Sequence, residues 1–153
     1  MKEFNLNKII ISNLTLDDID DILNIEKELN IHILSKENIK KDLDSSHYNY
    51  FIAKYKNSIV GYSSFSFVTD IEIESIVVKK DFQKLGIGNL LLNCIFNFAK
   101  TNNIENIFLE VRISNFPAIS LYKKNGFEKL DIRKNYYSDT KEDAIILRKI
   151  ITT

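Results

Sequence analysis

A glycine-containing turn is the segment of this chain whose residue types and spacing point most directly to chemistry. Gly86 and Gly88, two of the four glycines, separate a β-branched apolar run at 71–78 from an amphipathic stretch at 90–100. Glycines let the backbone approach a ligand closely, and the first N–H groups of a helix have no intrahelical acceptor. Such donors bind anions, so the turn predicts a site for a phosphate-bearing cofactor. The alternative is a tight strand-to-helix connection that binds nothing.

Two side chains downstream of the turn have the chemistry for proton transfer. Glu110 follows the apolar run 107–109, where a carboxylate is out of place in a core but can act as a base. Tyr122 lies on a predicted helix, and its phenol can donate a proton or a hydrogen bond. Both residues also have plain structural interpretations. Glu110 can be a strand-end carboxylate paired with Arg112 or solvent, and Tyr122 an aromatic side chain packed near Phe127.

A run of alternating charges supplies further carboxylates. Side chains on a strand alternate between its two faces, so Asp70, Glu72 and Glu74 are expected on one face and Ser75 on the other. Glu72 and Glu74 are therefore reserve candidates for the base, and an acidic face would suit a basic peptide. The alternative is a solvated sheet face with no catalytic role.

Composition narrows the classes of ligand. The 153 residues include 21 Lys+Arg and 21 Asp+Glu, so no domain-wide positive field favours nucleic acid. No stretch reaches the ~20 apolar residues of a membrane span, and no signal core follows the N-terminus, so we expect no membrane association and a cytoplasmic location. Cys94 is the only cysteine, and its place on the apolar face of a helix favours packing over nucleophilic catalysis. His32 and His47 lack metal-ligand spacing, which predicts no metal centre.

The pattern of apolar residues places these candidates on a mixed α/β chain. Thr15, Ser35 and Asn115 are candidate N-caps, Gly126 is a candidate C-terminal stop, and Lys56–Asn57 suits the turn of a hairpin. No repeat or linker interrupts the order, so residues 1–153 are predicted to form one domain. We expect helices over 15–29, 35–43, 90–100 and 116–125, and strands over 9–11, 48–55, 58–67, 70–79, 104–111, 127–133 and 143–151.

Gln83, Gly86 and Gly88 together match a known motif. The pattern Q-x-x-G-x-G, between an apolar strand and an amphipathic helix, resembles the Q/R-x-x-G-x-G/A signature that binds the pyrophosphate of acetyl-CoA in the GNAT superfamily of N-acetyltransferases. Further matches extend the resemblance to the RimI-type protein N-terminal acetyltransferases, and they lie in segments 109–115, 118–122, 126–127, 133–137 and 142–147. Residues 31–35 depart from that pattern, because these enzymes have an aromatic Pro-Trp-Ser-like element there and this chain has no tryptophan.

The resemblance implies an α/β (α+β) GNAT-like single domain, with a mixed, mostly antiparallel, twisted sheet of six or seven strands flanked by helices. It also implies acetyl-CoA as cofactor, released as CoA. Where two strands splay, the backbone N–H groups of Ile76, Val77 and Val78 are implied to contact it. The residues implied to surround its pyrophosphate are Gln83, Lys84, Leu85, Gly86, Ile87, Gly88 and Asn89. Asn115 is also implied to contact the cofactor, although it is equally a plain N-cap.

The resemblance further implies direct transfer of the acetyl group to an amine. In this mechanism Glu110 accepts a proton and Tyr122 acts as the general acid. The residues expected to bind the acceptor are Glu72, Glu74, Arg133, Tyr136 and Tyr137, although the two tyrosines can also be read as exposed aromatics of a hairpin surface.

The implied acceptor is a protein N-terminus, namely the N-terminal alanine of a small-subunit ribosomal protein, and the implied assembly is a monomer or weak dimer. Two alternatives stay open at this level. One is acetylation of a small-molecule amine or a lysine side chain, because the cofactor motifs are shared across the superfamily. The other is a regulator that binds acyl-CoA without turnover.

Overall fold

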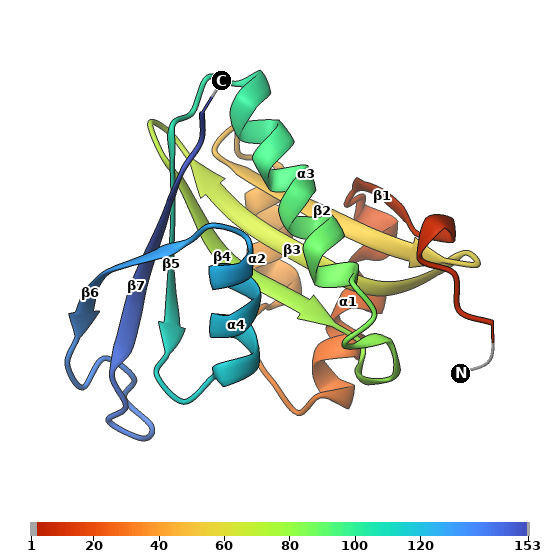
Figure 1. Cartoon of the computed structure of the whole chain (residues 1–153). Helices are drawn as coiled ribbons and strands as arrows, with labels where there is room; N and C mark the ends of the chain where they lie inside the picture. Colours follow the sequence, from red (N-terminus) through yellow and green to blue (C-terminus); the bar gives the residue numbers. More distant parts are fainter. Residues whose placement is uncertain (1–2, 153) are drawn as a thin grey trace.

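A computed structural model describes residues 3–152 of the chain, and within them seven strands form one sheet with helices on both faces (Figure 1). The strands are β1 (Ile10–Asn13), β2 (Tyr48–Tyr55), β3 (Ser58–Phe67), β4 (Ile71–Val78), β5 (Asn106–Arg112), β6 (Glu128–Arg133) and β7 (Ala144–Ile150). The helices are α1 (Ile19–Glu28), α2 (Lys36–Leu43), α3 (Ile87–Thr101) and α4 (Phe116–Lys124), and three short 3-10 turns cover Leu6–Lys8, Leu16–Asp18 and Lys80–Phe82.

Local signals account for most of these boundaries. The Ser35 hydroxyl accepts from the Asn38 backbone N–H at 3.1 Å, which caps α2. Lys56 and Asn57 have φ of 50° and 67°, the left-handed pair that a two-residue hairpin between β2 and β3 requires. The predicted strands and helices are confirmed, with two adjustments at their ends. The first helix opens with a 3-10 turn, and α3 begins at Ile87, three residues before the expected stretch.

The strand order is β1-β2-β3-β4-β5-β7-β6, and every neighbouring pair is antiparallel except β4 and β5. The parallel ladder joins only Ile71–Ile73 to Ile107–Leu109. Beyond it the two strands diverge toward their carboxyl ends, which leaves a gap in the middle of the sheet (Figure 1). The expected mostly antiparallel sheet is confirmed, and its one parallel pair is where the sheet opens.

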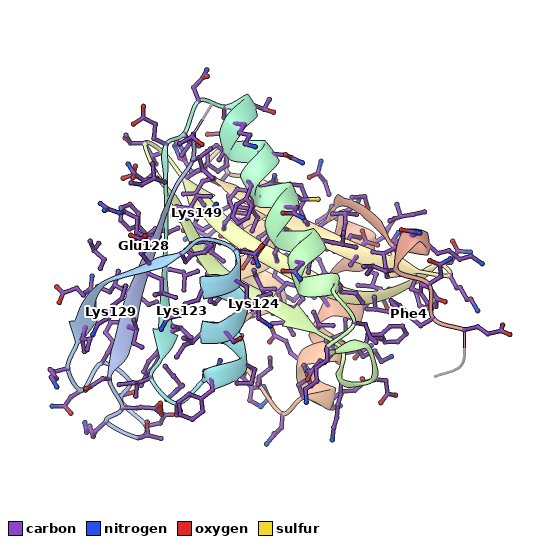
Figure 2. The ribbon with its side chains drawn as sticks, in the orientation of Figure 1. Phe4, Lys123, Lys124, Glu128, Lys129 and Lys149 are labelled. Carbon is purple, nitrogen blue, oxygen red and sulfur yellow. The ribbon has the colours of Figure 1, made fainter. Side chains whose placement is uncertain are left out.

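The sheet separates two apolar layers. On one face, α1 and α2 pack against β2 and β3 through a cluster that includes Ile22, Ile39 and Tyr62. On the other face, α3 and α4 pack against β4, β5 and β7 through a larger cluster that includes Ile95 and Tyr122. Phe4 lies on the opposite side of the view from Lys129, and its ring packs 5.0 Å from that of Tyr55 (Figure 2).

A β-bulge in β4 corrects the expectation that Ser75 lies opposite the acidic residues. Ser64 pairs with Ser75 and Phe65 with Ile73, so Glu74 is an extra residue with no partner on β3. The bulge reverses the alternation of side chains after Glu74. The hydroxyls of Ser75 and Ser64 are 2.5 Å apart, and Ser75 therefore lies on the same side of β4 as Glu74.

Across residues 3–152, no helix is both long enough and apolar enough to cross a bilayer.

Candidate active site

The turn before α3 is a row of backbone donors. Gln83 donates its N–H to Lys80, and Leu90 donates to Gly86, but between them the six N–H groups of residues 84–89 have no acceptor within the described chain. These groups open a fifteen-residue helix, whose N-terminal end carries partial positive charge. Consecutive free N–H groups at such an end form an anion-binding concavity, which fits a pyrophosphate.

The two glycines of this turn serve different purposes. Gly86 has φ of 95°, which an L-residue with a side chain rarely adopts, so the turn itself requires glycine there. Gly88 lies inside α3, where an added Cβ would come within 3.2 Å of Leu121 Cδ2. Gly88 thus also allows α3 to pack closely on α4, in addition to any role toward a ligand.

The side chains around the turn are partly engaged within the protein. The amide of Gln83 donates to the Val78 carbonyl oxygen at 3.0 Å and so ties the turn to the end of β4. The amide of Asn125 donates to Asn89 Oδ1 at 2.7 Å. Asn115 accepts from the Ala118 N–H at 3.3 Å, which confirms it as the N-cap of α4. Lys84 has φ of 63° and an exposed side chain.

The gap between β4 and β5 opens into a cavity of about 640 Å³. Its walls come from β4, the turn after it, the end of β5 and the connection between α1 and α2. The lining residues are Leu29, Ile31, His32, Ile33, Ile76, Val77, Val78, Gln83, Arg112, Asn115 and Asp139. The cavity therefore adjoins the row of donors, as a cofactor with a phosphate and a long arm would require.

Only some of the N–H groups expected to face this gap do so. The donors of a strand point alternately to its two edges. Lys79 donates to Val60 on β3 at 2.7 Å, so Val77 also points toward β3. The N–H groups of Ile76 and Val78 point the other way, where β5 has already diverged. The expectation for Val77 as a backbone donor is therefore wrong, although its side chain does line the cavity.

A second cavity, of about 870 Å³, lies on the face of β4, β5, β6 and β7 that carries Glu110. It gathers all of the expected acceptor residues with Glu110. Its lining residues include Asp70, Glu72, Glu74, Phe108, Glu110, Leu130, Arg133, Tyr136, Tyr137 and Ile146. Glu110 and Arg112 line the second and first cavities respectively, and these two residues are only about 7 Å apart along β5, so the two cavities are neighbours.

Glu110 forms its ion pair with Arg133 and not with Arg112, the partner considered from the sequence. Its Oε1 is 3.2 Å from Arg133 Nε, whereas Arg112 pairs with Asp139. The Glu110 side chain is 28 % exposed and so reaches the cavity. Tyr136 is near enough to Glu110 that hydrogen bonding to the carboxylate raises the pKa of the tyrosine. Glu110 is thus positioned by β6 and by the loop that follows it.

Glu74 differs from the other acidic residues of this cavity. Its pKa is raised first by burial, then by the negative charges of Asp42 and Glu72. A carboxyl with a raised pKa is a stronger base than an ordinary one, so Glu74 has the electrostatics of a proton acceptor. Its position on the bulge of β4 projects it toward the same cavity as Glu110.

Tyr122 lies on the other side of β5 from Glu110. It packs in the core with Phe127, their ring centroids 5.5 Å apart, and it lines neither cavity. Burial raises the pKa of the Tyr122 phenol to about 12. None of the described residues forms a hydrogen bond with the Tyr122 hydroxyl. The hydroxyl is not fully enclosed by the protein, so it has access to space beyond the core.

Cys94 is half-buried on α3, and burial raises the pKa of its thiol, which makes it a poor nucleophile. Within residues 3–152, no group of three or more His, Cys, Asp or Glu side chains has the arrangement of a metal site.

Several lining residues had no signal in the sequence. Leu29 and Ile31–Ile33 come to the first cavity because Glu26, buried on α1, accepts from the N–H groups of Ile33 and Leu34 at 3.0 and 3.2 Å. Asp139 comes to the same cavity through its pair with Arg112. The Arg112–Asp139 contact joins residues 27 apart in the sequence, and the Glu26 contacts span seven and eight residues past the end of a helix, so neither follows a periodicity that the sequence analysis could use.

Comparison with known proteins gives a consistent picture. The sequence model of the acetyltransferase (GNAT) family matches residues 16–127. An N-alpha-acetyltransferase of Sulfolobus acidocaldarius is 33 % identical over 147 residues, which cover 87 % of each chain. The crystal structure of the ribosomal-protein-S18-alanine N-acetyltransferase from Escherichia coli superposes with a TM-score of 0.85 at 28 % identity, covering 95 % of each chain. A GNAT family acetyltransferase from Elizabethkingia anophelis, solved with acetyl-CoA bound, gives 0.74 at 28 % identity, covering 94 % of this chain and 99 % of that one.

Proposed function

This chain belongs to the acetyltransferase (GNAT) family, and on that premise we propose that it acetylates the N-terminal α-amine of a protein, with the N-terminal alanine of a small-subunit ribosomal protein as the acceptor. The enzyme uses acetyl-CoA, which supplies the acetyl group as a reactive thioester. The observation that carries the proposal is the pair of neighbouring cavities along β4 and β5, one beside the donor row and one lined by carboxylates.

The first cavity and the donor row suit acetyl-CoA. The six free N–H groups of residues 84–89 can bind the pyrophosphate, and the cavity between β4 and β5 can hold the arm that ends in the thioester. The N–H groups of Ile76 and Val78 face the gap without a partner on β5. Such donors stabilise the negative charge that develops on a carbonyl oxygen during acyl transfer.

The second cavity suits the acceptor. An α-amine has a pKa of ~7.7 to 8.0, so most of it is protonated at neutral pH and is attracted to carboxylates. Glu72, Glu74 and Glu110 line the cavity, and Arg133 neutralises only part of their charge. Glu110 lies on the same strand as Arg112, which borders the cofactor cavity. We assign Glu110 as the base that takes the amine proton, directly or through a water molecule.

Tyr122 is assigned to the departing sulfur. Because its pKa is about 12, the phenol keeps its proton at neutral pH. A thiol has an ordinary pKa of ~8.5, so complete transfer of the phenol proton to the thiolate is unfavourable by roughly 5 kcal/mol. Tyr122 therefore acts as a hydrogen-bond donor to the sulfur, and the released thiolate takes its proton from solvent. This is a smaller role than the general acid that the resemblance implies for Tyr122.

The acceptor names of the relatives support the same proposal. The Sulfolobus protein is named an N-alpha-acetyltransferase, and the Escherichia protein acts on an alanine of ribosomal protein S18 by its name.

The test is incubation with acetyl-CoA and a set of peptides, read by mass spectrometry. One peptide has a free N-terminal alanine and an internal lysine, and its matched control has the same sequence with a blocked N-terminus. We expect acetylation of the first peptide at its α-amine and none of the control. Modification of lysine in both peptides, or of small amines alone, would refute the N-terminal assignment. Tight CoA binding without release of thiol from any acceptor would instead identify a non-catalytic regulator.

A further inference from the structure

The connection between β6 and β7, residues 134–143, forms a wall of the acceptor cavity through Tyr136 and Tyr137. Two residues of this connection have left-handed backbone conformations, Asn135 with φ of 52° and Lys141 with φ of 60°. A ten-residue loop has many alternative conformations, so something must hold this one in place. Backbone bonds within the loop contribute, since Tyr137 donates to the Glu142 carbonyl at 3.2 Å and Lys141 to the Tyr137 carbonyl at 2.8 Å. Several side-chain contacts of the loop also converge on one residue of a neighbouring strand.

That residue is Arg112, which ends β5. Its Nη1 and Nη2 donate to the two carboxylate oxygens of Asp139 at 3.1 and 3.0 Å, and Nη1 also donates to the Thr140 hydroxyl at 3.2 Å. The guanidinium carbon lies 3.9 Å from the centre of the Tyr137 ring, and Glu142 Oε1 lies 3.9 Å from Nη1. One planar cation thus contacts four residues of the loop.

These contacts decide what Arg112 can do. Arg112 lines the cofactor cavity, where a free guanidinium would be suited to a phosphate. However, both of its terminal nitrogens are already bound to Asp139, and the pairing lowers the pKa of that carboxyl. The charge of Arg112 is therefore used inside the protein, and the groups that remain for phosphate are the backbone donors of residues 84–89.

We propose that Arg112 is a positioning residue, which fixes the 134–143 loop so that Tyr136 and Tyr137 form the wall of the acceptor cavity. The inference rests on the proposed function, because it assigns that cavity to the acceptor. The Arg112–Asp139 pair borders the cofactor cavity, while Tyr137, stacked on the same guanidinium, borders the acceptor cavity. One ion pair therefore links the walls of both cavities.

The loop has a second attachment that must survive for the test to be informative. Glu142 accepts hydrogen bonds from the backbone N–H and the hydroxyl of Ser114, and Asp143 accepts from the Asn135 N–H at 2.9 Å. These bonds do not involve Arg112. Loss of the Arg112 contacts should therefore loosen residues 135–141 without unfolding the end of the loop or the sheet.

The experiment compares Arg112→Lys and Asp139→Asn with the wild-type chain. Lysine keeps the charge but loses the two-pronged geometry and the planar stacking surface. The matched control is Arg148→Lys, which makes the same chemical change on β7. Arg148 forms no ion pair among the described residues. Amide hydrogen exchange measures the loop directly, without any acceptor. Steady-state kinetics with the peptide that has a free N-terminal alanine measure the acceptor KM and kcat separately.

Because the Arg112 and Asp139 side chains are partly exposed, at 35 % and 62 %, we expect both test variants to exchange the loop amides about threefold to fivefold faster and to raise the acceptor KM by a similar factor. The acetyl-CoA Kd and the control variant should stay within about twofold of wild type, since the donor row is untouched.

Unchanged exchange in the loop, or a tenfold loss of acetyl-CoA affinity in Arg112→Lys with no effect of Asp139→Asn, would overturn the proposal. Failure of the wild type to acetylate any N-terminal peptide would refute the proposed function instead, and the exchange result would still decide the role of Arg112.

Discussion

Replacing Glu110 with glutamine removes the proposed base while keeping the shape of the side chain. The amide oxygen of glutamine can still accept from Arg133 Nε, which lies 3.2 Å from the carboxylate in the wild type. Arg133 is 56 % exposed and Glu110 is 28 % exposed, so the lost ion pair costs no more than ~1 kcal/mol of unfolding free energy. We therefore expect a folded variant whose acetyl-CoA affinity is unchanged, because Glu110 lines only the acceptor cavity.

The expected loss of turnover follows from the task of the base. A positioned general base contributes roughly 10² to 10⁴ in rate, so we expect kcat to fall by about 10² or more at pH 7. An α-amine with a pKa of ~7.8 is about 14 % neutral at pH 7 and about 94 % neutral at pH 9. The variant, which depends on amine that is already neutral, should therefore gain about sevenfold between these two pH values.

The assay measures the acetylated peptide by mass spectrometry at pH 7 and pH 9. Glu74→Gln is the necessary comparison, because burial and the charges of Asp42 and Glu72 raise the pKa of Glu74 and make it the strongest rival base. Full activity of Glu110→Gln together with a 10²-fold loss in Glu74→Gln would refute our assignment and place the base on β4. Equal losses in both variants at pH 9 would also contradict it, since a sevenfold gain leaves Glu110→Gln with a loss of about tenfold or more, whereas Glu74→Gln should have none.

Three further outcomes follow from the same structure. Tyr122→Phe should lower kcat about 10- to 10²-fold at unchanged acetyl-CoA Kd, the value of a hydrogen bond to a charged atom, and an unaltered kcat in steady-state assays would remove Tyr122 from the mechanism. Gly86→Val should weaken acetyl-CoA binding in calorimetry more than Gly126→Val, because both glycines have positive φ but only Gly86 belongs to the donor row. Tyr62→Phe should lower the unfolding free energy by about 1.5 to 3 kcal/mol in urea titrations, because the Tyr62 hydroxyl donates to the buried carboxylate of Glu26; a midpoint equal to wild type would show that this bond is not stabilising.

Local chemistry made much of the fold predictable. The β2–β3 hairpin was expected at Lys56–Asn57 because a polar pair suited to a turn lies between two runs rich in aromatic and other β-forming residues. Ser35 and Asn115 were expected as N-caps because their short side chains reach the free N–H groups of a first helical turn. Each of these features depends on atoms within a few residues of one another. The sequence could therefore indicate them without knowledge of the tertiary fold.

The bulge at Glu74 shows where such reasoning stops. A strict alternation places Ser75 on the face opposite Glu74, but the register between β3 and β4 shifts by one residue at that point. A register is a property of two strands, and the sequence of one strand does not contain it. The same limit applies to Val77, whose N–H points toward β3 because of how β3 pairs with β4.

The sequence by itself determined that the chain carries a glycine turn before a helix, a carboxylate at Glu110 and tyrosines near residue 136, because residue types and short spacings encode backbone donors, acids and helix starts. Only the tertiary structure decided how they are brought together. The β4–β5 ladder ends after three residue pairs and opens the sheet, Arg133 rather than Arg112 holds Glu110, and Arg112 holds the acceptor loop. These outcomes depend on contacts between distant segments, whose geometry is set by packing and strand pairing across the whole chain.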